Sequence, residues 1–324
     1  MVRKKPENVN GINAIHEMNC PDYAPKKVNL PVKESFFVQT GRGHHIVDTH
    51  MATVGKIGLL RLGINVEAVG INVFNPDYVS FSLPLSWSGD YFVNGELANR
   101  SSIYMPGSLN SFHFRSRSRD TIGVTMPRSA FVNTVAALRG VDGDDISLSV
   151  RELRLSESAG WRVRSRLSAI IKETCDERKQ RSQKMISEDV VSLLADAYLV
   201  ALPKSLIVSN RIYQPGRIVR LAEERFMAAE GAPISLADLC VAAGVGKTTL
   251  YKAFNQVCGL PPLDYFQKRR FMRARSLLIN TSNHRGRVRQ IALTSGFTEL
   301  GRFSVQYRAL FGESPSVTLS QDSD

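Results

Sequence analysis

Apolar and polar positions follow two different rhythms along the chain. From residue 30 to about residue 128, short apolar runs of strand length alternate with turn signals such as Asn94-Gly95 and Pro106-Gly107. Asn-Gly flanked by segments of alternating hydrophobic and polar residues is the strongest short-range signal for a β-hairpin. We therefore expect an antiparallel sandwich or barrel. Its strands are predicted over residues 56–62, 69–74, 78–83, 90–93 and 122–126.

After residue 127 the period becomes helical. Helices are predicted over residues 129–139, 157–178 and 186–202, and in the last of these Val190, Leu193, Leu194 and Ala197 recur at i, i+3, i+4 and i+7. Residues 209–216, which include Pro215, are predicted to be a linker. The first 29 residues lack periodicity, which indicates an arm. The pattern thus divides the chain into 1–29, 30–128, 129–208 and 209–324, with an α+β fold overall.

The clearest helical pattern begins at Ser235, a good N-cap whose partner Asp238 lies three residues later. Gly244 supplies a left-handed residue that ends this helix. A second helix follows, and two short amphipathic helices joined by a glycine turn form a helix-turn-helix. The apolar faces of the two helices consist of Leu236, Leu239, Cys240 and Ala243, and of Leu250, Ala253, Phe254 and Val257.

The same unit occurs a second time, with Gly296 in the place of Gly244. One face of its first helix is lined by Val288, Ile291, Ala292 and Ser295, and the inner side of its second helix carries Phe303, Tyr307, Leu310 and Phe311. A single helix of about 18 residues, roughly 27 Å long, is predicted from residue 262 to 280 between the units. That length suits two recognition helices lying about one DNA turn apart, ~34 Å, on one face of a duplex.

In each helix-turn-helix unit, the exposed face of the second helix carries side chains of the kind that contact phosphates and base edges. In the first unit these candidates are Lys247, Thr248, Thr249, Tyr251, Lys252 and Asn255, and in the second they are Glu299, Arg302, Ser304 and Val305. Glu299 could accept a hydrogen bond from a cytosine amine, and Val305 could contact a thymine methyl. Arg285, Arg287 and Arg289, which lead into the second unit, are predicted phosphate contacts, against the alternative of a solvated loop.

The two units and the helix between them resemble the signature of AraC/XylS-type transcription regulators, over roughly residues 215 to 315. The resemblance rests on Tyr265-Phe266, Arg270-Phe271, Ala274, Leu277-Leu278, Ile291-Ala292, Gly296-Phe297, Phe303, Tyr307 and Gly312. It implies a cupin-like sensor domain at 30–128, and a helical region at 129–208 that commonly pairs subunits. The alternative for those helices is packing on the barrel of their own subunit. The family often has Arg or another polar residue at the site of Val305, so we expect the second unit to contribute more affinity than sequence information. It usually closes with Pro-x-x-Tyr/Phe-Arg, whereas Ser316-Val317-Thr318 follow Pro315 here, so we expect a looser C-terminal cap.

Composition agrees with a nucleic-acid partner. The net charge is +12, and residues 211–324 hold 16 Lys and Arg against 9 Asp and Glu. Excess positive charge favours polyanion binding but does not choose between DNA, RNA and membrane surfaces. No apolar run reaches the ~18 residues that a membrane span needs, no signal peptide is recognised, and the four cysteines lack metal-binding spacing. We expect a cytoplasmic protein without disulfides.

Four other motifs have competing interpretations. Residues 244–248 resemble the end of a phosphate-binding loop, but a helix is predicted before them where that motif needs a strand. His44, His45 and His50 suggest a metal, but adjacent histidines on a strand point to opposite faces and no Glu follows before Glu67. Arg115, Arg117 and Arg119 are expected on one strand face, as an anion site or as a solvated edge. Of the arginines in the long central helix, all of which could be DNA contacts, Arg270 is assigned a structural role by the resemblance.

The sequence therefore predicts a DNA-binding transcription regulator, an activator, with no catalysis and no cofactor. Its expected partners are double-stranded DNA, RNA polymerase, a small-molecule effector and a second copy of the chain, with no membrane. Two alternatives stay open at this point. One is a cupin-type metalloenzyme fused to a DNA-binding module, and the other is a ligand-independent regulator acting through protein contacts.

Overall fold

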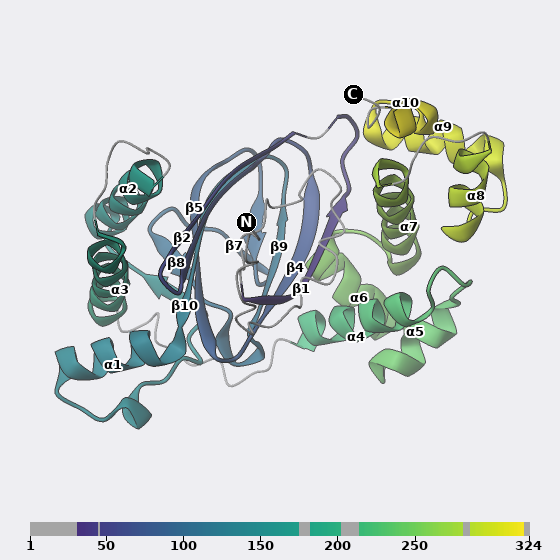
Figure 1. The fold of residues 1–324 in the computed structure, drawn as a ribbon. Helices are drawn as coiled ribbons and strands as arrows, with labels where there is room; N and C mark the ends of the chain where they lie inside the picture. Colours follow the sequence, from purple (N-terminus) through teal and green to yellow (C-terminus); the bar gives the residue numbers. More distant parts are fainter. Residues whose placement is uncertain (1–30, 45, 175–181, 202–213, 281–285, 321–324) are drawn as a thin grey trace, which may run out of the picture.

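The computed structural model describes residues 31–44, 46–174, 182–201, 214–280 and 286–320. Two antiparallel sheets face each other in the N-terminal half (Figure 1). The five-stranded sheet has the order β1-β4-β9-β6-β7 and the six-stranded sheet the order β11-β8-β5-β10-β3-β2. The strands are β1 (Val32–Gln39), β2 (Val47–Val54), β3 (Ile57–Ile64), β4 (Ala68–Phe74), β5 (Tyr78–Trp87), β6 (Tyr91–Val93), β7 (Glu96–Leu97), β8 (Ser102–Tyr104), β9 (Ser111–Ser116), β10 (Arg119–Pro127) and β11 (Glu152–Arg154).

All five predicted strand regions are strands in the structure, and the predicted Asn94-Gly95 hairpin joins β6 to β7. Both turn residues have positive φ, 53° and 84°, as a type I′ turn requires. The sheet arrangement is an open sandwich, which is one of the two architectures that the pattern left open.

Three helices cover the outer face of the six-stranded sheet: α1 (Arg128–Arg139), α2 (Glu157–Thr174) and α3 (Gln183–Val200). Their buried residues, among them Phe131, Leu167 and Leu194, form one core with Leu59, Leu83 and other residues of the sheet. The predicted all-helical pattern after residue 127 is wrong at one point, because β11 pairs with β8. A three-residue strand leaves almost no periodicity in the sequence, so only its pairing identifies it.

The C-terminal half is helical: α4 (Gln214–Ala228), α5 (Leu236–Ala243), α6 (Lys247–Cys258), α7 (Pro262–Ile279), α8 (Arg287–Thr294), α9 (Leu300–Phe311) and α10 (Pro315–Ser320). The predicted capping box of Ser235 and Asp238 is present. Gly244 ends α5 with φ 65°, as expected. One correction concerns the linker predicted over residues 209–216: residues 214–216 already belong to α4, and the rest lies outside the described residues.

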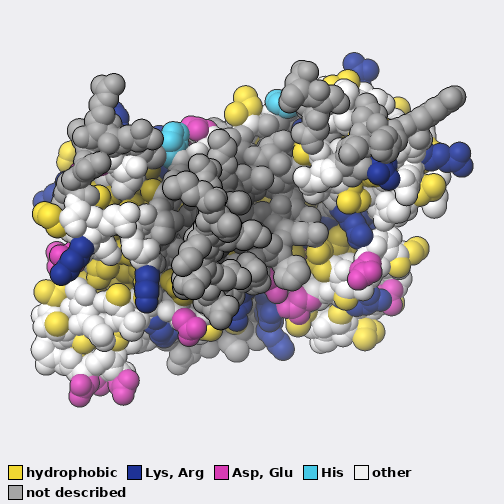
Figure 2. Space-filling view, viewed as in Figure 1, with side chains coloured by type: hydrophobic (Ala, Val, Ile, Leu, Met, Phe, Trp, Pro, Cys, Tyr) yellow, Lys and Arg dark blue, Asp and Glu magenta, His cyan; other side chains and the backbone are white. Residues whose placement is uncertain are grey.

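The C-terminal helices pack against the outer face of the five-stranded sheet, so the two sheets lie between two helical layers (Figure 1). Phe36, Val38, Val69 and Ile71 of this sheet are buried in one cluster with residues of α4, α5, α6 and α7. In the space-filling view, Lys and Arg side chains are scattered over the C-terminal helices on the right (Figure 2). Among the described helices, none is both long and apolar enough for a membrane span.

Candidate nucleic-acid interface

The first recognition helix, α6, buries one face and exposes the other. Leu250, Ala253, Phe254 and Val257 are buried against α4, α5 and α7. The predicted contacts Lys247, Thr248, Thr249, Lys252 and Asn255 are exposed, and Tyr251 is half-buried. The ammonium of Lys247 lies 6.0 Å from the centroid of the Tyr251 ring. This helix therefore presents two cations, two hydroxyl groups, a phenol and an amide on one surface.

The second recognition helix, α9, has the same organisation with different chemistry. Phe303, Tyr307, Leu310 and Phe311 are buried, whereas Arg302, Ser304 and Val305 are exposed. Val305 is 71% exposed. Glu299 is exposed at the N-cap, 3.9 Å from Arg302 Nη1. The Ser304 hydroxyl donates to the carbonyl oxygen of Leu300, so part of its hydrogen-bonding capacity is satisfied within the helix.

The two units correspond closely. Lys252 lies two residues after Leu250, the first buried residue of α6, and Val305 lies two residues after Phe303, the first buried residue of α9. Gly259 and Gly312 end the two helices with φ 68° and 82°. At equivalent exposed positions the first unit thus offers a cation and the second an isopropyl group. The second unit can read a methyl group there but cannot accept or donate a hydrogen bond.

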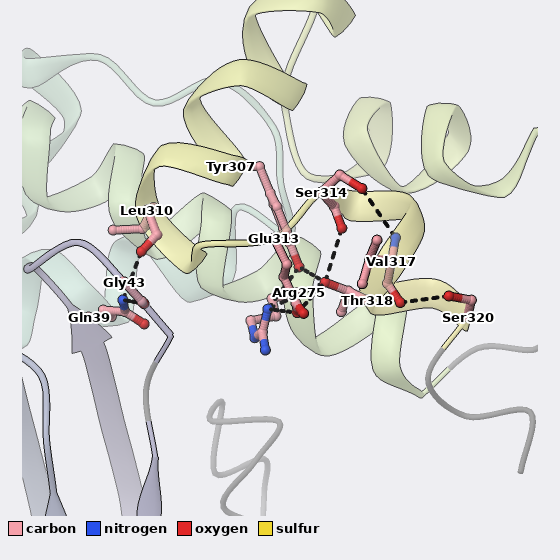
Figure 3. A network of polar contacts seen from close by, with 10 residues as sticks. All are labelled: Gln39, Gly43, Arg275, Tyr307, Leu310, Glu313, Ser314, Val317, Thr318 and Ser320. Carbon is pink, nitrogen blue, oxygen red and sulfur yellow. Dashed lines mark hydrogen bonds and ion pairs between the residues drawn. The ribbon is translucent and has the colours of Figure 1, made fainter.

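Helix α7 connects the units through two buried ion pairs. In the middle of α7, Arg269 Nε lies 3.0 Å from Glu223 Oε1, and both side chains are almost completely buried. The Tyr265 hydroxyl donates to the same carboxylate. Further along, Arg275 Nη1 lies 2.6 Å from Glu313 Oε1 (Figure 3). Buried arginines therefore tie α7 to α4, which packs on the first unit, and to Glu313, which follows the second recognition helix.

The second ion pair belongs to a larger network. The Thr318 hydroxyl is within 2.8 Å of Glu313 and accepts a hydrogen bond from Tyr307 (Figure 3). Burial raises the pKa of Glu313, but hydrogen bonds from Thr318 and Arg275 outweigh it, and the net shift is downward. Burial raises the pKa of Tyr307 to about 12. The expected loose C-terminal cap is wrong, because Thr318 is buried in this network.

The arginines of α7 and of the segment leading into α8 differ in exposure. Arg269 and Arg275 are buried and structural rather than available to DNA. Arg270, which was assigned the structural role, is half-buried beside Gly296. Of the predicted phosphate contacts, Arg289 is exposed, Arg287 is half-buried and donates to Gln290, and Arg285 lies outside the described residues.

Arg115, Arg117 and Arg119 do not share a strand face, so the single face predicted for them is wrong, and β9 is not an edge strand. Arg115 is in β9, Arg117 is exposed in the following turn, and Arg119 opens β10. The Arg119 guanidinium is buried between the sheets, 3.7 Å from the centroid of the Phe114 ring, and donates to Ser116. Alternation along a single strand predicted one face, but the chain reverses at this point.

The remaining motifs are residues 244–248 and the histidines of the N-terminal half. Helix α5 precedes residues 244–248, as expected, and this is not the strand that a phosphate-binding loop needs. His50 lies 3.7 Å from Asp48, His44 is exposed, and His45 lies outside the described residues. Within the described ranges, no three His, Cys, Asp or Glu side chains are grouped as metal ligands would be.

Comparison with known proteins gives these helices a family. Residues 239–321 match the family described as "Helix-turn-helix domain". The chain is 33% identical over 153 residues to the XylDLEGF operon transcriptional activator of Pseudomonas putida, a match covering 45% of this chain and 46% of that protein. The chain thus spans about half the length of this relative.

A shorter relative is covered almost completely. XylDLEGF operon transcriptional activator 2 of Pseudomonas putida is 31% identical over 144 residues, which are 43% of this chain and 88% of that protein. A crystal structure of a transcriptional regulator with an AraC-type DNA-binding domain, from Chromobacterium violaceum, is 30% identical over 34% of this chain and 95% of its own, with a TM-score of 0.31. The chain belongs to the AraC/XylS family of helix-turn-helix transcriptional regulators.

Proposed function

We propose that this protein is a sequence-specific transcription activator that places α6 and α9 in successive major-groove segments of one DNA duplex. Buried ion pairs tie α7 to Glu223 of α4 and to Glu313, which follows α9. The observation that carries the proposal is the pair of amphipathic recognition helices, α6 and α9, that α7 connects. Both have polar or small exposed faces over an aromatic core. Two rigidly connected helices recognise a longer sequence than either does alone, and the relatives carry the printed name of activator.

The proposed contacts divide by chemistry. On α6 they are Lys247, Thr248, Thr249, Tyr251, Lys252 and Asn255, and on α9 they are Arg302, Ser304 and Val305 with Glu299 at its start. Lysine and arginine bind guanine or phosphate, asparagine binds adenine, and a valine methyl contacts thymine. Arg285, Arg287 and Arg289 are proposed to bind phosphates, which set register without specifying sequence.

The rest of the chain is proposed to control this binding. Residues 30–128 are assigned as a sensor for a small-molecule effector, residues 129–208 as the region that pairs two copies, and residues 209–324 as the DNA-binding domain that meets RNA polymerase. Exposed apolar residues on α2 and α3, including Trp161 at 63%, support a subunit contact there. The pairing faces would be those pointing away from the sheet.

We further propose a cytoplasmic location and no catalysis of its own. The metalloenzyme alternative is not favoured, since the relatives are named as transcription activators. The effector is open to direct test, because a ligand that binds only the folded state raises the unfolding temperature. A metabolite library that never shifts it would favour a regulator acting through protein contacts.

In the decisive experiment, the full chain selects duplexes from a random pool. The most enriched duplex is then footprinted with the full chain. The proposal expects two protected major-groove segments about one turn apart. The matched variants are Lys252→Ala on the exposed face of α6 and Arg139→Ala, which is exposed in α1. Enrichment of no sequence, or equal loss in both variants, would contradict the proposed function.

A further inference from the structure

The C-terminal end of α9 is held by a residue of the N-terminal half. The Gln39 amide nitrogen, at the end of β1, lies 2.9 Å from the carbonyl oxygen of Leu310 and 2.8 Å from that of Gly43 (Figure 3). The Gly43 amide donates to the same Leu310 oxygen at 3.0 Å. The last four carbonyls of a helix have no partner within the helix. Gln39, which is completely buried, therefore caps the second recognition helix from the neighbouring sheet.

The C-terminal end of α6 meets a second residue of the same sheet. Arg115 in β9 approaches Gly259, the left-handed residue that ends α6, so closely that a Cβ at Gly259 would lie 2.3 Å from Arg115 Nη1. The guanidinium also lies 4.3 Å from the centroid of the Phe92 ring on the adjacent strand. A cation at the C-terminal end of a helix is favoured by the helix dipole. The first recognition helix is thus also held at its end.

The two polar contacts flank an extensive apolar one. Phe36, Val38, Val69 and Ile71 are buried in one cluster with residues of α4, α5, α6 and α7, and the Arg269 guanidinium lies 5.1 Å from the centroid of the Phe36 ring. Lys268 of α7 donates to the carbonyl oxygen of Thr40 at 3.0 Å. The sheet therefore forms a second connection between the units, in addition to α7.

This docking leaves the proposed DNA-contacting faces open. Lys247, Lys252 and Asn255 on α6, and Arg302 and Val305 on α9, are exposed while the sheet is in place. The sheet consequently does not block DNA. It contacts α6 and α9 at their C-terminal ends.

We propose that Gln39 and Arg115 are positioning residues, which fix α9 and α6 relative to each other and so set the spacing between the two DNA segments that the chain accepts. The inference rests on the proposed function for its DNA consequence. Linked binding modules gain affinity only when their geometry matches the spacing of their sites. A looser connection lowers affinity for the preferred spacing and tolerates altered spacings better.

The first test uses the full chain without DNA. Hydrogen–deuterium exchange is followed in residues 308–314 and 255–260, which span the two helix ends. Gln39→Ala is expected to speed exchange in the former segment by on the order of fivefold and to leave the latter unchanged, since one capping interaction is lost. Arg115→Ala should give the reverse pattern. The controls are Lys33→Ala, exposed in β1, and Arg117→Ala, exposed two residues after Arg115.

The second test uses DNA selected from a random pool by the wild-type full chain, and the same duplex with one to three base pairs inserted between the two protected segments. Gln39→Ala and Arg115→Ala should bind the parent duplex roughly tenfold more weakly, with a smaller further loss on insertion than wild type shows. The two controls should behave as wild type.

The outcomes separate the two proposals. Folded variants with wild-type exchange and wild-type spacing preference would overturn the positioning role. Uniformly faster exchange over the whole C-terminal half would also overturn it, because the residues would then act through general stability. A wild-type chain that enriches no sequence refutes the proposed function and the spacing role together, while the exchange pattern still decides whether the two helix ends are held.

Discussion

His113 is a buried titratable residue in the interface between the five-stranded sheet and the C-terminal helices. It is directly opposite Ile71 in the β4–β9 pairing, on the face that packs against those helices. Burial, and then the positive charges of Arg151 and Arg220, lower its pKa to about 3. Arg220 belongs to α4, so part of this shift comes from the DNA-binding half. The imidazole is therefore neutral in the folded protein at neutral pH.

The shifted pKa gives stability a pH dependence with a defined sign. Between pH 6.5, the ordinary value, and about 3, the unfolded chain binds a proton at His113 that the folded chain does not. Stability from this residue is thus complete above pH 6.5 and lost as pH falls, by at most about 1.4 kcal/mol per pH unit. Urea denaturation of wild type and His113→Asn across this range should show a smaller slope in the variant. The exposed His50→Gln is the control, and equal slopes in all three proteins would contradict the assignment.

We also expect base recognition to depend on single residues. Lys252→Ala removes an exposed side chain of α6, so folding should be unchanged while binding to the selected duplex falls by ~1–3 kcal/mol and preference at one position relaxes. Arg289→Ala, at a proposed phosphate contact, should weaken all sequences alike and lower the salt slope by about one unit. Titrations of specific and scrambled DNA at several salt concentrations measure both. Equal losses on the two DNAs for Lys252→Ala would make α6 an electrostatic anchor.

At the scale of elements, α7 is the part on which both units depend. Its pair Arg275–Glu313 is buried, with 2% and 12% of the side chains exposed. Removing one partner of such a pair leaves an uncompensated charge and typically costs about 3–5 kcal/mol. Arg275→Met should therefore lower the urea midpoint of the helical half strongly, whereas the exposed Arg308→Met should not.

A double variant tests the cause of that loss. Arg275→Met combined with Glu313→Leu removes both charges, and apolar replacements of a whole buried pair are often nearly neutral. The double variant should recover much of the stability that the single variant loses. If it is no more stable than Arg275→Met, packing of the arginine stem rather than the ion pair is responsible. Far-UV circular dichroism follows the helices throughout.

The elements of the helix-turn-helix units were predictable because each has one buried face. Spacing in α6 identified Leu250, Ala253, Phe254 and Val257 correctly. The same method was incomplete for α7, which buries not only Tyr265, Phe271, Ala274 and Leu278, as spacing predicts, but also Phe266, Arg269, Met272 and Arg275. This helix packs against both units and β1, so no single apolar stripe exists. Which arginine enters the core then depends on where the carboxylates of Glu223 and Glu313 lie, and these are distant in sequence.

The same limit applies to the sheets. The pattern located β3, β4, β5, β6 and β10, but β11 and the separation of Arg115 from Arg119 depend on long-range pairing. The exposed faces of α6 and α9 followed from the sequence, since they lie opposite apolar stripes. Contacts across the interface, such as Gln39 with Leu310, could not be predicted, because they join residues 271 positions apart.

At the scale of the whole molecule, the DNA-binding half depends on the sheet that packs against it. Residues 211–324 expressed alone would expose the faces of α4, α6 and α7 that Phe36, Val38 and Ile71 now cover. They would also lose the proposed second copy of the chain, which adds linked DNA contacts. We therefore expect the fragment to bind the selected duplex, but more weakly than the full chain, by at least roughly tenfold.

Two comparisons separate the causes of that weakening. The fragment and the full chain are titrated against the selected duplex, and the mass of the free full chain is measured by sedimentation. If the full chain is dimeric, a duplex with a single binding site removes the contribution of pairing. Any difference that persists on this duplex is due to the docked sheet, because one copy then contacts one site in both cases. Equal affinities on both duplexes would mean that neither pairing nor docking strengthens DNA binding.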